Sequence, residues 1–127
     1  MIKIDKTSII HKNAQIDDNV SIGPFCNIED EVKIGAGSII LSNVNVMSGT
    51  TIGENNIIHQ NSVIGGDPQD LKFDNEKTEL IIGNNNTIRE FCTLNKGTDY
   101  SGKTTIGNNC LLMAYVHVAH DCIVSDK

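Results

Sequence analysis

The chain has no tryptophan and only three phenylalanines and two tyrosines among its 127 residues. It also lacks any apolar run near the ~20 residues that a helix needs to cross a bilayer, and its first residues do not form a signal peptide. The net charge of −6 disfavours general nucleic-acid binding, which requires a basic surface. We therefore expect a single cytoplasmic domain over residues 1–127, with no transmembrane segment and no nucleic-acid partner.

What the chain does contain is an aliphatic residue at every sixth position. The series is Ile4, Ile10, Ile16, Ile22, Ile28, Ile34, Ile40, Val46, Ile52, Ile58 and Ile64, and it returns in phase at Ile82, Ile88, Leu94, Ile106, Leu112, Val118 and Val124. A period of six fits neither a helix nor a simple amphipathic strand, and it is typical of a parallel β-helix in which each hexad forms one short strand and one corner. We expect an all-β fold of about six rungs around an aliphatic column, with no helix longer than two turns. The few aromatic residues suit so narrow a core.

Two other positions of the hexad are restricted. Small or β-branched residues stand two positions before the aliphatic, and all four cysteines are among them: Cys26, Cys92, Cys110 and Cys122. We interpret these cysteines as small buried hydrophobes and not as disulfide partners or metal ligands. Glycine often follows the aliphatic directly, at Gly23, Gly35, Gly53, Gly65, Gly83 and Gly107. We expect these glycines to supply the positive φ of a sharp corner.

Two segments interrupt the repeat and are therefore the places to look for function. About twelve extra residues lie between Ile64 and Ile82, and six lie between Leu94 and Ile106. If both are loops, they leave the same corner, the one that follows the face carrying Ile10, Ile28, Val46, Ile64, Leu94 and Val118. The alternative is that the first insert hides a further rung. Pro68, the charged residues and the absence of an aliphatic at positions 70 and 76 favour a loop.

A cluster of titratable residues follows at the same corner. His117, His120 and Asp121 fall outside the inward positions, so their side chains should face outward. Two histidines and a carboxylate suggest either general-base chemistry or a metal site. We interpret His11 and His59 as ordinary surface residues, whereas His120 lies at the corner that carries both loops.

Four segments resemble the UDP-N-acetylglucosamine acyltransferases, a family of hexapeptide-repeat enzymes that performs the first step of lipid A synthesis. They are Ile64–Phe73, Ile88–Glu90, Asn95–Thr98 and His117–Cys122. The match runs through the chain in order, and its loop Pro-Gln-Asp-Leu-Lys at positions 68–72 is far more specific than the hexads. The resemblance implies a left-handed triangular prism with 18 residues per turn, assembled as a homotrimer.

The resemblance also implies a reaction. An (R)-3-hydroxyacyl chain would pass from acyl carrier protein to the 3-hydroxyl of UDP-N-acetylglucosamine, with no cofactor and no metal. His120 corresponds to the general base and Asp121 to the residue beside it that supports it. The substrate-binding positions of the family fall on Gln69, Asp70, Lys72 and His117. The first loop can fold back to His120 of its own chain or, as the family architecture implies, reach a neighbouring subunit.

The chain departs from the family pattern in two places. Asn95 stands where relatives often carry a histidine, so the contact of that histidine is not reproduced. The chain also ends at Lys127, whereas family members continue through further rungs and a C-terminal helical domain, which suggests an N-terminal portion of the enzyme. The residues do not determine the acyl length, or whether the acceptor is a hydroxyl or an amine.

Other functions are compatible with the hexads alone. A UDP-3-O-acyl-glucosamine N-acyltransferase shares them, but it normally has an extra N-terminal domain, and here the repeat begins at Ile4. A carbonic anhydrase of the γ type needs a wider histidine spacing and a third histidine. An ice-binding solenoid needs a regular outward array, whereas the outward residues here are mixed. An inactive trimeric β-helix scaffold is the non-enzymatic alternative.

Overall fold

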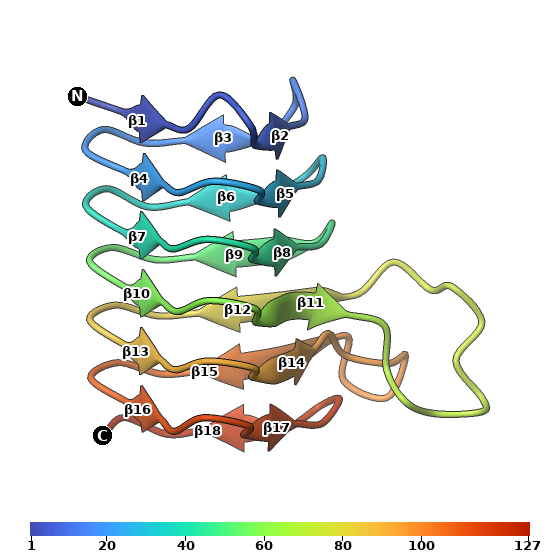
Figure 1. Ribbon diagram of the computed structural model, residues 1–127. Helices are drawn as coiled ribbons and strands as arrows, with labels where there is room; N and C mark the ends of the chain where they lie inside the picture. The colour runs from blue at the N-terminus through green and yellow to red at the C-terminus, as the bar shows by residue number, and fades with distance from the viewer.

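The computed structural model describes residues 1–127 and contains eighteen strands and no helix, arranged as three parallel sheets of six strands each (Figure 1). The first sheet consists of β1 (Lys3–Ile4), β4 (Ser21–Ile22), β7 (Ile39–Ile40), β10 (Ile57–Ile58), β13 (Thr87–Ile88) and β16 (Leu111–Leu112). The second consists of β2 (Ile9–Ile10), β5 (Asn27–Ile28), β8 (Asn45–Val46), β11 (Val63–Gly66), β14 (Thr93–Asn95) and β17 (His117–Val118). The third consists of β3 (Gln15–Ile16), β6 (Lys33–Ile34), β9 (Thr50–Ile52), β12 (Glu79–Ile82), β15 (Lys103–Ile106) and β18 (Ile123–Val124).

Each rung contributes one strand to every sheet, so the chain winds as a triangular prism of six rungs. Ile4 pairs with Ile22, 18 residues later, and the same step joins the other uninterrupted rungs. The predicted left-handed parallel β-helix is confirmed. Since the structure contains no helix, it has no helical segment that could span a membrane.

The aliphatic column forms the core as predicted. Ile28, Ile40, Ile58 and Ile88 are completely buried in four successive rungs. Burial of this aliphatic column provides the main stabilisation of a fold with so narrow a core. The two end rungs lack a neighbour on one side. Ile4 in the first rung is therefore 41% exposed.

The prediction for the cysteines is confirmed for three of the four. Cys26, Cys92 and Cys110 are buried, whereas Cys122 is exposed. Cys122 does occupy the position two residues before Val124, but it belongs to the last rung and no further rung packs over it. Burial at this position therefore depends on a following rung that packs against it, as well as on the hexad.

The prediction for the glycines is wrong at five of the six positions. Among them only Gly65 has a positive φ. At most corners the left-handed residue lies three positions after the in-phase aliphatic, which is two positions after the one where glycine often stands. The residues there are Asn19, Phe25, Glu31, Gly37, Asn43, Gly49, Asn55, Asn61, Asn85, Phe91, Asn109, Tyr115 and Asp121. Asparagine is common there because its short polar side chain tolerates this conformation better than most residues do.

Glycine is required after the aliphatic for a different reason, which is the close approach of successive rungs. A Cβ atom at Gly35 would lie 2.6 Å from the carbonyl carbon and oxygen of Gly53 in the next rung. At Gly83 it would meet the backbone of Gly107 in the same way. The glycines of this corner thus allow backbone to pack on backbone.

Both interruptions are loops, as predicted. Ile64 pairs with Leu94, and Leu94 pairs with Val118, so the register of the second sheet continues across both insertions. The longer loop joins β11 to β12 and projects from the prism, and the shorter loop joins β14 to β15 beside it (Figure 1). This arrangement excludes a hidden rung in the first insert and brings the two loops to one corner.

Candidate active site

The site is built on the corner turn that follows β17. Val118 points into the core, so the next residues, His120 and Asp121, are carried to the outer edge of the last corner. Asp121 has a φ of 63°, and its backbone amide donates to Oγ1 of Thr104 at 2.9 Å. The left-handed turn directs the Asp121 carboxylate toward the shorter loop, which joins β14 to β15.

The Asp121 carboxylate is surrounded by donors from that loop. Its Oδ1 accepts hydrogen bonds from the Thr98 amide at 3.0 Å and from Oγ of Ser101 at 2.6 Å. Its Oδ2 accepts one from Oγ1 of Thr98 at 2.5 Å and contacts Nδ1 of His120 at 2.9 Å. The side chain is only 8% exposed.

These contacts determine the charge of Asp121. Burial disfavours the ionised carboxylate, but the hydrogen bonds from Ser101, Thr98 and His120 outweigh it and hold the pKa of Asp121 well below the ordinary 3.8. Asp121 is therefore an anion at neutral pH, and an anionic carboxylate only accepts hydrogen bonds.

The ionised Asp121 in turn determines the tautomer of His120. Nδ1 of His120 must donate the hydrogen bond to Asp121, so in the neutral ring Nε2 carries the free lone pair. Nε2 lies on the groove side, 4.0 Å from Oδ2 of Asp70. A histidine held in this way can remove a proton from a ligand hydroxyl placed beside Nε2.

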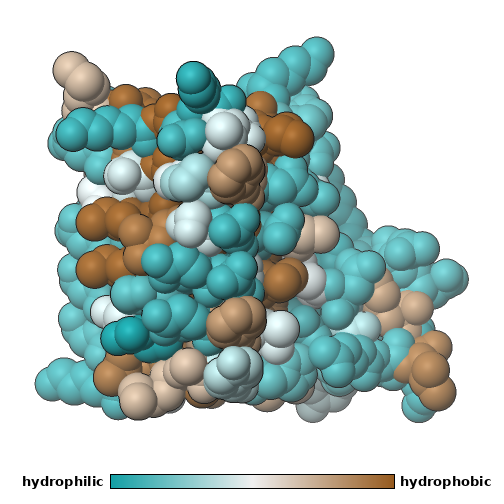
Figure 2. All heavy atoms as spheres, in the orientation of Figure 1, coloured by the Kyte–Doolittle hydropathy of each residue, from teal (hydrophilic) through white to brown (hydrophobic).

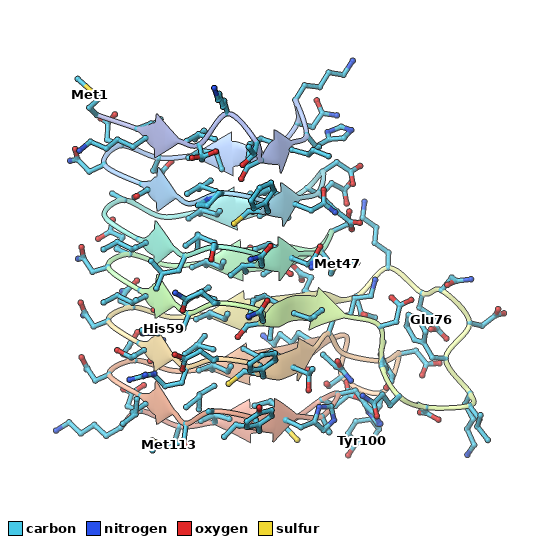
Figure 3. The ribbon with its side chains drawn as sticks, viewed as in Figure 1. Met1, Met47, His59, Glu76, Tyr100 and Met113 are labelled. Carbon is cyan, nitrogen blue, oxygen red and sulfur yellow. The ribbon has the colours of Figure 1, made fainter.

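A groove of about 430 Å³ opens in front of this nitrogen. The two loops and the corner turn line it together, through Asp70, Lys72, Phe73, Thr98, Asp99, Tyr100, His120 and Asp121. Within the chain, the longer loop folds back toward its own His120. Figure 3 shows Tyr100 on the loop side of the prism, on the opposite side of the view from His59.

Lys96 holds the longer loop against the shorter one. Its ammonium lies 3.3 Å from Oδ1 of Asp67 and 5.7 Å from the centre of the Phe73 ring, so it combines an ion pair with a cation–π contact. The Lys96 side chain is only 17% exposed. At the base of the loops, Oγ1 of Thr78 donates to the carbonyl of Gly97. These contacts place Asp70 and Lys72 opposite His120.

Two of the six site residues expected from the sequence do not line the groove. His117 lies on the flat second sheet, where its Nδ1 contacts Oγ1 of Thr93 at 2.8 Å. Gln69 is exposed on the loop, and its side chain makes no hydrogen bond. His120, Asp121, Asp70 and Lys72 do come together.

Asn95 occupies a buried position at the end of β14. It is 4% exposed, and its Nδ2 has no hydrogen-bond partner. A Cβ at Gly66 would lie 3.4 Å from Oδ1 of Asn95, so the side chain lies against the base of the longer loop. Asn95 is not among the residues that line the groove.

Thr98 and Ser101 were not expected from the sequence to be site residues. Thr98 was part of a motif that resembles the family, but no periodicity indicates that either hydroxyl reaches Asp121. No three His, Cys, Asp or Glu side chains in the structure are grouped so as to hold a metal ion. A second polar groove, of about 480 Å³, lies at the other end of the longer loop, where Lys77 pairs with Glu31 at 3.1 Å. It contains no histidine or cysteine that could act as a base or nucleophile.

The chain is similar in sequence and in structure to known proteins. Residues 31–66 match the family model described as bacterial transferase hexapeptide (six repeats). The acyl-[acyl-carrier-protein]–UDP-N-acetylglucosamine O-acyltransferase of Aliarcobacter butzleri is 54% identical over 100% of this chain and 49% of its own length. The corresponding protein of Bartonella bacilliformis is 46% identical over 96% of this chain and 45% of its own.

Solved structures give the same result. The UDP-N-acetylglucosamine O-acyltransferase of Moraxella catarrhalis superposes with a TM-score of 0.95 at 47% identity, over 96% of this chain and 48% of its own. The UDP-N-acetylglucosamine acyltransferase of Campylobacter jejuni superposes with a TM-score of 0.93 at 38% identity, over 98% of this chain and 48% of its own. The chain thus spans about half the length of the relatives it matches.

Proposed function

Because the chain is related over nearly its whole length to the UDP-N-acetylglucosamine O-acyltransferases, we propose that its β-helix serves the transfer of an acyl chain to UDP-N-acetylglucosamine. The donor is an (R)-3-hydroxyacyl chain on acyl carrier protein, and the acceptor is the 3-hydroxyl of the sugar. The reaction is the first step of lipid A synthesis. The proposal rests above all on one observation, the His120–Asp121 pair that faces Asp70 and Lys72 across a groove.

His120 acts as the general base. The sugar hydroxyl is a poor nucleophile, so Nε2 of His120 removes its proton as the oxygen attacks the thioester carbonyl. The new C–O bond forms and the C–S bond breaks, and the proton held by the imidazolium passes to the departing thiolate of the carrier protein. Asp121 holds Nδ1 and stabilises the imidazolium while the proton is on the ring.

Asp70 and Lys72 bind the nucleotide sugar. Oδ2 of Asp70 lies 4.0 Å from Nε2 of His120, so Asp70 can accept a hydrogen bond from a sugar hydroxyl held beside the base. Lys72 lines the same groove and offers a cation to the acceptor, which carries two phosphates. Gln69 and His117 remain proposed substrate contacts outside this groove.

We further propose that the chain assembles as a homotrimer with parallel prisms. A narrow rod buries little surface by itself, and apolar side chains gather over β7 and β10 (Figure 2). Ile39 and Ile57 are neighbours there on adjacent strands. Sedimentation at micromolar concentration distinguishes the states: a trimer is expected, and a monomer alone would contradict the assembly.

The function is tested by acyl transfer from 3-hydroxyacyl carrier protein to UDP-N-acetylglucosamine, with the product identified by mass spectrometry. The assay uses the chain itself and a hybrid in which it replaces the segment it matches in the Aliarcobacter butzleri relative. We expect O-acylated product, and a loss of about 10²–10⁴ in turnover in His120→Ala. The matched control is His59→Ala, which lies away from the loops and should keep normal turnover. Near-normal turnover in His120→Ala, or product only with an amino-sugar acceptor, would reject the proposal.

A further inference from the structure

The short loop after β14 has a function that the family resemblance does not assign. Two of its hydroxyl-bearing residues, Thr98 and Ser101, reach across to Asp121 in the next rung, 23 and 20 residues later in the chain. Thr98 is 6% exposed, so its hydroxyl has little access to water and depends on Asp121 as its acceptor. Oγ of Ser101 also lies 3.0 Å from the carbonyl of Lys103, but the contact with the Asp121 carboxylate is shorter, at 2.6 Å. A hydroxyl has one hydrogen to donate, and the charged acceptor is the stronger one.

The two loop residues account for three of the four hydrogen bonds to the carboxylate. An ionised carboxylate has about four acceptor positions, and here the Thr98 amide and Ser101 occupy those of Oδ1. On Oδ2, the Thr98 hydroxyl occupies one position and Nδ1 of His120 the other. The carboxylate therefore cannot rotate without breaking several bonds, and a single acceptor position remains for the histidine.

We infer that Thr98 and Ser101 are positioning residues for the acyl transfer proposed above, because they lock the Asp121 carboxylate and through it the orientation and tautomer of His120. Neither residue needs to touch the reacting atoms. If the carboxylate turned, Nδ1 of His120 would lose its acceptor, and the proton could move to Nε2. A ring with its proton on Nε2 cannot accept the proton of the sugar hydroxyl at that nitrogen. The shorter loop thus keeps the base in its active form.

The first test measures the tautomer and is independent of activity. The ¹⁵N shifts of His120 are recorded by NMR at a pH at which the ring is neutral. We expect the chain to show the proton on Nδ1, and the double variant Thr98→Val, Ser101→Ala to shift toward the tautomer with the proton on Nε2. The substitutions leave in place the other titratable groups of the groove, Asp70, Lys72, Asp99 and Tyr100. An unchanged tautomer in the double variant would overturn the inference.

Matched variants separate positioning from folding. Thr98→Ser keeps the hydroxyl and should keep the tautomer. Ser101→Ala alone changes an exposed residue, so it should fold normally and give a smaller shift in the same direction. Thr105→Val, on the outer face of β15, is the control for a lost hydroxyl away from the corner and should give no shift.

The second test measures turnover. In the double variant we expect kcat to fall by about 10- to 100-fold, the loss that is typical when a partner that orients a metal-bound histidine is removed. The KM for the nucleotide sugar should be unchanged. A loss of kcat with an unchanged tautomer would also overturn the inference. The proposed function fails on a different result, normal turnover in His120→Ala, so the two failures can be distinguished.

Discussion

The carboxamide oxygen of Asn56 accepts a 2.9 Å hydrogen bond from the backbone amide of Asn86, which lies one rung away and 30 residues later. Nδ2 of Asn56 donates to the carbonyl of Gly83 at 2.8 Å, and Asn86 repeats both contacts toward Gly107 and Cys110. Buried asparagines thus form hydrogen bonds with backbone groups at a corner, where the pairing of strands does not provide partners for them.

Replacing Asn56 by alanine should therefore destabilise the fold. The side chain is fully buried, and its loss leaves the Asn86 amide and the Gly83 carbonyl without these partners. With about 1–3 kcal/mol for each buried group left unpaired, we expect the free energy of unfolding to fall by about 3 kcal/mol. Urea denaturation measures the change. The neighbouring Asn55→Gly is the control, because Asn55 is exposed and has a φ of 55°, and an equal loss there would contradict the argument.

Gly35→Ala should also destabilise the chain, by about 1–3 kcal/mol, because the new methyl group would be forced against the backbone. The added Cβ lies 2.6 Å from the Gly53 carbonyl, and backbone cannot move aside as a flexible side chain can. Gly23→Ala is the matched variant at another corner, where the nearest backbone atom is 3.2 Å away. Thermal unfolding should show the larger loss for Gly35→Ala, and equal losses would argue against rung spacing as the cause.

Thiol labelling should separate one cysteine from the other three. Cys122 is exposed, whereas Cys26, Cys92 and Cys110 are buried. Burial also raises the pKa of the Cys26 and Cys92 thiols and so disfavours the reactive thiolate. Labelling with a disulfide reagent should show one fast thiol in the folded chain. Cys122→Ser should remove this fast phase, and its persistence would show that another thiol is accessible.

The stabilising contribution of Asp121 should depend on pH. Its pKa is lowered in the folded chain, so ionised Asp121 stabilises the fold at pH values above the ordinary 3.8. This contribution is lost as the pH falls below 3.8 toward the lower pKa of the folded state. We therefore expect Asp121→Asn to lower the melting temperature clearly at pH 7, with a difference that shrinks below pH 3.8. A difference that grows on acidification would contradict the lowered pKa.

Lys96→Gln should loosen the longer loop without unfolding the β-helix. The substitution removes the ion pair with Asp67 and the cation–π contact with Phe73, which together contribute about 1 kcal/mol. We expect proteolytic cleavage within residues 67–77 to become about fivefold faster, with an unchanged circular dichroism spectrum. Lys77→Gln is the control, because the Lys77–Glu31 pair is exposed. Equal acceleration by both variants would show that Lys96 has no special part in holding the loop.

The hexad period alone predicted the number of rungs and the register of the strands. A period of six places every in-phase aliphatic on the inside, and a one-residue slip would turn Ile64 and its equivalents toward water. This constraint extends through the insertions, so the pairing of Ile64 with Leu94 and of Leu94 with Val118 could be counted in advance. The corner that carries the loops and His120 follows from the same count.

The contacts between rungs could not be predicted from the hexads. The glycines are needed because backbone from the next rung lies against them, and Cys122 is exposed because no rung covers it. A hexad pattern describes which way a side chain points along one strand, but it does not describe what the neighbouring rung brings to it. The same limit applies to the site. Thr98 and Ser101 lie in an irregular loop that does not follow the hexad period, so their contacts with Asp121 could not be counted from the repeat. These contacts form only when the folded prism brings neighbouring rungs together.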